Sequence, residues 1–140
     1  VATRLHVDMA ELRMLLDRVE GEDALKGRAR EIDIKISALS QMETDMQSKI
    51  GRGEKPGAGS SLMKIMASTL GQEISTIKME AIGNYNLPHN NLLLLNEEVT
   101  IGEPEHQTIS AGYLNDRAST VFGGAREVQK NIIAKSVLGL

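Results

Sequence analysis

Two stretches at the start of the chain repeat apolar residues at steps of three and four, which places them on one face of an α-helix. The first row ends before Gly21 and consists of Leu5, Met9, Leu12, Leu16 and Val19. The second follows Asp23, a residue type that caps helices, and consists of Leu25, Ala29, Ile32, Ile36, Leu39, Met46 and Ile50. We therefore expect two amphipathic helices.

A third row of the same period follows a connector, residues 51–59, that is rich in glycine and contains a proline. Ser60 or Ser61 is expected to cap this helix, and its row is Met63, Ala67, Leu70, Ile74, Ile77 and Ala81. It should end near Gly83, and a last amphipathic helix begins after Gly123-Gly124. The pattern predicts an all-α protein, an antiparallel four-helix bundle in up-down-up-down order, with a long irregular loop before the last helix.

Glu43 interrupts the second apolar row where an apolar residue was due. A carboxylate buried without a partner is costly, so we expect it at the edge of the row, reaching solvent. Between Tyr85 and Gly112 the period is lost, although Leu92–Leu95 form an uninterrupted apolar run. Such a loop favours either packing against another domain or subunit, or folding back on the bundle, and the sequence leaves both open.

Composition excludes several classes of function. The 140 residues suit one domain, and 41% of them are apolar, enough for a core. A net charge of −3 argues against nucleic acid or an anionic membrane as the main partner. The chain has no cysteine, no apolar run long enough to span a bilayer, and no signal-like start. Glu103, Glu105 and His106 are too few and too flexible to predict a metal site.

The Gly123-Gly124 pair marks the first candidate site. Glycines let the backbone approach a partner group closely, and the helix that follows points unpaired N–H groups and its positive dipole end toward that group. This arrangement suits an anion or a phosphate-bearing cofactor. A sharp turn with no ligand is the other interpretation of the same residues.

A longer motif surrounds this pair. Residues 122–135 read Phe-Gly-Gly-Ala-Arg-Glu-Val-Gln-Lys-Asn-Ile-Ile-Ala-Lys, and the chain ends in Val-Leu-Gly-Leu. This resembles the C-terminal signature of the flavin-dependent acyl-CoA dehydrogenases. Residues 51–57, 70–74, 80–83 and 113–117 resemble further parts of the same family in the same order. The resemblance implies that residues 1–140 are the helical C-terminal domain of a longer flavoprotein, since Val1 is no initiator and the family places other domains upstream.

The resemblance also implies an activity, the α,β-dehydrogenation of acyl-CoA thioesters with FAD as cofactor. The domain would contribute flavin contacts and an oligomer surface, in a homodimer, a homotetramer or a mixed complex, and would be inactive alone. The implied location is the bacterial cytoplasm or an organelle matrix, and not the secreted fraction.

By the resemblance, five positions contact the flavin: Phe122, Gly123, Gly124, Ala125 and Glu127. Ala125 stands where the family usually has Ser or Thr, so a hydroxyl contact is lost or replaced by a backbone N–H. Arg117 and Arg126 either reach a phosphate or lie exposed on a helix.

The catalytic residue is not identified by the resemblance. In one branch of the family the base is a glutamate directly after the signature's aromatic residue, but that position is Gly123 here, and glycine cannot take a proton. Other branches carry the base on an earlier helix. Glu11 is the carboxylate of the first predicted helix, but its position is not aligned with the base of those branches, so the role is not assigned to it. Some members with glycine act in a mixed pair whose other subunit carries the base. A non-catalytic helical interaction module, or an inactive partner subunit, is therefore the alternative function.

Overall fold

The computed structural model describes residues 1–86, 103, 106 and 108–139 of the chain. These residues form α-helices and short 3-10 helices and no strand, which confirms the all-helical class. In chain order the elements are α1 (Ala2–Asp17), α2 (Asp23–Gly51), α3 (Gly59–Ile82), η1 (Gly83–Asn86), α4 (Ile109–Asp116), η4 (Arg117–Thr120) and α5 (Arg126–Leu138). None of these helices is long and apolar enough to cross a membrane. Leu92–Leu95 lie outside the described residues.

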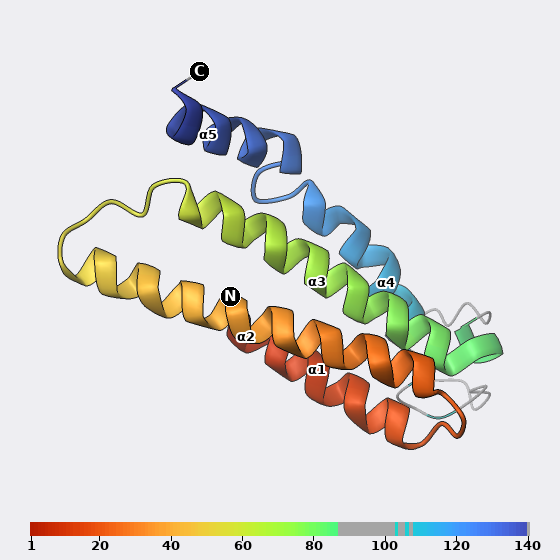
Figure 1. The fold of residues 1–140 in the computed structure, drawn as a ribbon. Coiled ribbons are helices and arrows are strands. Elements are labelled where there is room, and N and C mark those ends of the chain that lie inside the picture. The colour runs from red at the N-terminus through yellow and green to blue at the C-terminus, as the bar shows by residue number, and fades with distance from the viewer. Residues whose placement is uncertain (87–102, 104–105, 107, 140) are drawn as a thin grey trace, which may run out of the picture.

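The core lies where α1, α2 and α3 pack against one another, and α3 is the central helix (Figure 1). The predicted apolar rows supply it, as expected from their spacing. Its most completely buried large side chains are Met9, Leu12, Ile36, Leu39, Ile74 and Ile77. Ile50, at the end of the second row, is instead 50% exposed, because α2 continues past the point where its neighbours cover it.

The last part of the chain contains one more α-helix than predicted, α4, which lies before the predicted glycine break. Figure 1 shows α4 and α5 running back along α3 one after the other, separated by η4 and a turn. Both helices contact α3. A four-helix bundle is therefore not confirmed, and the described residues show a three-helix core with two shorter helices on α3. The predicted break keeps α5 separate from the preceding helices, since Gly123 and Gly124 have positive φ and lie between η4 and α5.

Both predicted helix caps are wrong. Asp23 is already the first residue of α2, and Glu22 precedes it without a side-chain capping bond. The third helix begins at Gly59, before either serine, and Ser60 Oγ donates to the carbonyl oxygen of Gly57 at 3.3 Å. Ser61 is buried. The serines therefore lie within the first turn of α3, two and three residues past the cap position, which Ala58 occupies.

Glu43 has partners that the sequence did not reveal. Its carboxylate accepts hydrogen bonds from the backbone nitrogen of Val1 at 2.6 Å and the Ala2 N–H at 3.0 Å, which ties α2 to the start of α1. The prediction of an edge position agrees with its partly exposed side chain, but the carboxylate is held by the chain as well as by solvent.

Candidate functional site

The turn between η4 and α5 brings the predicted site residues together. The N–H groups of Val121 and Phe122 donate to the carbonyl oxygen of Ala118, at 2.9 and 3.0 Å, and close the end of η4. The backbone then passes through two positive φ angles, +67° at Gly123 and +100° at Gly124, before α5 begins at Arg126. The predicted glycine break and the helix that follows it are confirmed.

Each glycine of the turn has a physical reason. Residues with a side chain rarely adopt these φ angles, so both positions favour glycine. A Cβ on Gly124 would in addition overlap the side-chain amide of Gln129, whereas a Cβ on Gly123 would meet only Lys64 Cε, at 4.0 Å. The backbone of the turn is therefore open on the side of Gly123.

The turn has free surface for a partner. Phe122 is 56% exposed, Gly123 and Glu127 are exposed, and Gly124 and Ala125 are half-buried. Ala125 precedes α5 and no side chain caps this helix, so the N–H groups of its first turn are not bonded by a capping side chain. This arrangement can accept hydrogen-bond acceptors or negative charge.

The two arginines beside the turn are not simply exposed. Arg117 Nε donates to the carbonyl oxygen of Tyr113 at 3.2 Å, and its guanidinium lies 4.2 Å from the centre of the Tyr113 ring. Arg126 Nη2 donates to Thr69 Oγ1 at 3.0 Å, but its buried Nε has no hydrogen-bond partner among the described residues. Arg117 is thus engaged by the fold, and Arg126 keeps a donor for a further group.

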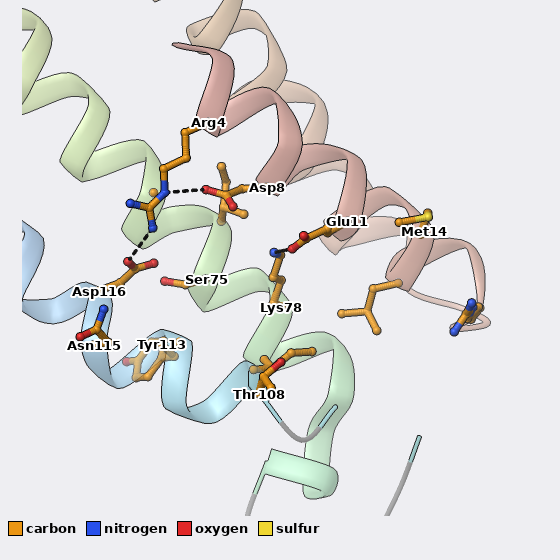
Figure 2. Close-up of a pocket in the computed structure, with 16 residues that line it drawn as sticks. Arg4, Asp8, Glu11, Met14, Ser75, Lys78, Thr108, Tyr113, Asn115 and Asp116 are labelled. Atoms are coloured by element: carbon orange, nitrogen blue, oxygen red, sulfur yellow. Dashed lines mark hydrogen bonds and ion pairs between the residues drawn. The ribbon is translucent and has the colours of Figure 1, made fainter. Parts of the chain in front are cut away.

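A pocket of about 500 Å³ lies between α1, α3 and α4 (Figure 2). Glu11 lines it and forms an ion pair with Lys78 at 2.7 Å. Arg4 lies between Asp8, at 3.8 Å, and Asp116, at 4.0 Å. Sequence analysis did not single out Asp8, although its place three residues after Leu5 sets it at the edge of the apolar row.

This pocket is distant from the glycine turn. Glu11 pairs with Lys78, whereas Gly123 is next to Lys64. Those two lysines are separated by about 20 Å along α3 at a rise of about 1.5 Å per residue. Glu11 is therefore badly placed to serve as a base for chemistry at the turn, and the catalytic base stays unassigned.

Burial in this pocket raises the pKa of the Asp8 carboxyl, the nearby Glu11 and Asp116 add to the increase, and Lys78 and Arg4 oppose it. Because the folded chain binds this proton more tightly than the unfolded chain, the free energy of unfolding falls as pH rises through the folded-state pKa. We expect Asp8→Asn to gain stability relative to the parent chain between about pH 4 and pH 7, measured by urea unfolding.

A high-salt series is the control for Asp8→Asn. Salt screens the pairs with Arg4 and Lys78 but leaves burial unchanged, so the pH-dependent difference should persist in about 1 M salt. Loss of the difference in salt would show that ion pairs, and not burial, control this carboxyl.

Metal binding receives no support from the part of the chain that the structure describes, in which no group of three or more His, Cys, Asp or Glu side chains converges. His106 and Glu103 bond to each other through the backbone and the His106 ring. Glu105 lies outside the described residues.

Comparison with known proteins agrees with the motif around the turn. Residues 6–138 match the family described as "Acyl-CoA dehydrogenase, C-terminal domain". Acyl-CoA dehydrogenase IpdE1 of Mycolicibacterium smegmatis is 32% identical over 87 residues, which are 62% of this chain but 19% of that protein. No solved structure matches the chain. Because the family match covers nearly every residue, this chain belongs to the acyl-CoA dehydrogenase family as its C-terminal domain.

Proposed function

We propose that this chain is the C-terminal helical domain of an FAD-dependent oxidoreductase that introduces a double bond between the α and β carbons of an acyl-CoA thioester. The domain supplies flavin contacts and an oligomer surface and is inactive alone. Family membership over residues 6–138 is the observation that carries the proposal. The assembly is a homo-oligomer or a mixed complex in the bacterial cytoplasm or an organelle matrix.

The glycine turn fits a flavin nucleotide. Gly123 has open space where a Cβ would lie, the first turn of α5 has no side-chain cap, and buried Arg126 Nε lacks a partner among the described residues. A group rich in hydrogen-bond acceptors and negative charge would satisfy these donors. FAD would be held by Phe122–Ala125 and Glu127, and when bound it supplies the hydride acceptor of the reaction.

The chain's own contribution is orientation and exclusion of water. Phe122 offers an apolar ring at the exposed edge of the turn, and the backbone of Gly123 and Gly124 offers close approach without side chains. Ala125 has no hydroxyl, so polar contacts from this position come from the backbone N–H. Rigid placement of such groups lowers the cost of bringing reactants together.

Proton removal from the α-carbon needs a carboxylate that this turn does not supply. Gly123 has no titratable group, and Glu11 pairs with Lys78, which lies about 20 Å along α3 from Lys64, the neighbour of Gly123. The base therefore comes from another part of the longer polypeptide or from a partner subunit. The second candidate function, an inactive partner subunit or a helical interaction module, rests on the same residue, Gly123.

The test is the visible absorbance of the full-length polypeptide, recorded anaerobically before and after adding a panel of acyl-CoAs. We expect a flavin band that bleaches with one acyl-CoA class, whereas the 140-residue chain alone should not retain FAD, because other domains complete the pocket. A flavin band that never bleaches would favour the inactive partner. A colourless full-length protein would contradict the flavoprotein assignment.

A further inference from the structure

A row of polar side chains follows the side of α3 that faces away from the three-helix core. At a helical rotation of 100° per residue, the buried side chains Met63, Leu70, Ile74 and Ile77 lie on one side of α3. The opposite side carries Lys64, Thr69, Gln72 and Ser75. Each of the four has a hydrogen-bond partner between residues 116 and 126. The row therefore fixes the segment that leads through the glycine turn.

Gln72 and Arg117 form a reciprocal clamp at the start of this segment. The side-chain amide of Gln72 donates to the carbonyl oxygens of Asp116 at 2.9 Å and Arg117 at 3.3 Å. In return, Arg117 Nη2 donates to the backbone carbonyl oxygen of Gln72 at 3.3 Å and to Ser75 Oγ at 2.9 Å. Asp116 ends α4 and Arg117 begins η4, so Gln72 holds the junction between these two helices.

Three further hydrogen bonds hold the turn, two before it and one after it. Before it, Ser119 is bound twice, by Lys64 Nζ to its carbonyl oxygen at 2.8 Å and by Gln72 Nε2 to its hydroxyl at 3.3 Å. After it, Arg126 is bound to Thr69 at 3.0 Å. Phe122 and Gly123, between these points, are exposed, so little packing of their own fixes them.

We propose that Gln72 is a positioning residue for the glycine turn, because its amide fixes the end of α4 and thereby the direction from which the backbone enters Gly123 and Gly124. The importance of this position for flavin rests on the proposed function, but the positioning itself does not. The relevant property of Gln72 is its pair of N–H donors, which a side chain of the same size without them lacks.

Gln72→Glu tests the donor directly, since it preserves size and offers no hydrogen to the carbonyls when ionised. We expect amide-hydrogen protection at Val121 and Phe122 to fall about tenfold near pH 7, the size of roughly one hydrogen bond, while protection in α2 stays within about threefold. Near pH 4 the introduced carboxyl becomes protonated and regains one donor, so part of the protection should return.

Gln41→Glu is the matched control. Gln41 lies exposed on α2 and donates to Asp45 at 2.9 Å, so the same replacement there should leave Val121 and Phe122 unchanged. Equal loss of protection in α2 and at the turn, or no loss at the turn, would overturn the positioning role.

If Gln72→Glu does not fold, Ser119→Ala removes one acceptor of the same amide and should lower protection at Val121 and Phe122 by about twofold to threefold. Unchanged protection there would overturn the role.

A second measurement separates this inference from the proposed function. In the full-length polypeptide, Gln72→Glu should lower the flavin retained per protein, measured by absorbance, while Gln41→Glu should not. If the unmodified full-length protein holds no flavin, the proposed function fails and the exchange result still decides the positioning role. If it holds flavin and Gln72→Glu holds as much, the turn's orientation does not control flavin binding, and the importance of Gln72 for flavin is overturned.

Discussion

Replacing Ile36 with alanine is expected to lower the free energy of unfolding by about 3 kcal/mol. Ile36 is fully buried on α2 between α1 and α3, so the shorter side chain loses apolar contacts and leaves a cavity that rigid neighbours fill only in part. Urea unfolding of the 140-residue chain, followed by circular dichroism, measures the change. Such a loss is a large share of the 5–15 kcal/mol typical of a folded domain.

Ile34→Ala is the control for this prediction. It makes the same replacement on α2 two residues before Ile36, but the Ile34 side chain is 71% exposed. Its effect should stay within about 0.5 kcal/mol. If the two variants lose similar stability, α2 does not present the Ile36 face to the core, and the packing of the three long helices described above is wrong.

The burial of Ile36 and the exposure of Ile34 also show what the sequence reveals well. Steps of three and four along a helix place residues on one face whatever the rest of the fold does. The rows that contain Leu12, Ile36 and Ile77 therefore predicted the core correctly. Helix starts were less predictable, because several neighbouring residues compete for the capping position, as at Ser60 and Ser61.

The extra helix α4 and the clamp on α3 could not be predicted from local pattern. Gln72 contacts Arg117 across 45 positions of sequence, and no local spacing reveals such a pair. Asp8 is a different case, since its place at the edge of an apolar row was visible. Its burial depends on α3 and α4 closing the other sides of the pocket, which requires the tertiary arrangement.

The family resemblance located the candidate site because the motif after Thr120 is short and specific, whereas physics alone left a plain turn as the alternative. The structure adds the reason for its glycines, a pair of positive φ angles and, at Gly124, a conflict with Gln129. It also shows that the turn is held from outside, by side chains of α3. Site geometry therefore depends on residues that the motif does not contain.

Gly124→Ala is expected to disturb the turn more than a Gly→Ala replacement at any other glycine that the structure describes. Alanine at φ +100° is strained, and its Cβ would displace the Gln129 side chain, so the free energy of unfolding should fall by about 1–2 kcal/mol. In the full-length polypeptide we expect retained flavin to fall at least about tenfold, because losing roughly 1.4 kcal/mol of binding free energy weakens the affinity by that factor. Urea unfolding and visible absorbance measure the two effects.

Gly112→Ala is the matched control and should act in the opposite direction. Gly112 lies within α4 at an ordinary helical φ with open space around its Cβ position, so alanine should stabilise the chain by about 0.5–1 kcal/mol.

Adding Gln129→Ala to Gly124→Ala removes the overlap but not the backbone strain, which separates the two causes. Full recovery in the double variant would show that the overlap alone requires glycine. No recovery would leave the φ angle as the cause, and a harmless Gly124→Ala would contradict the described turn.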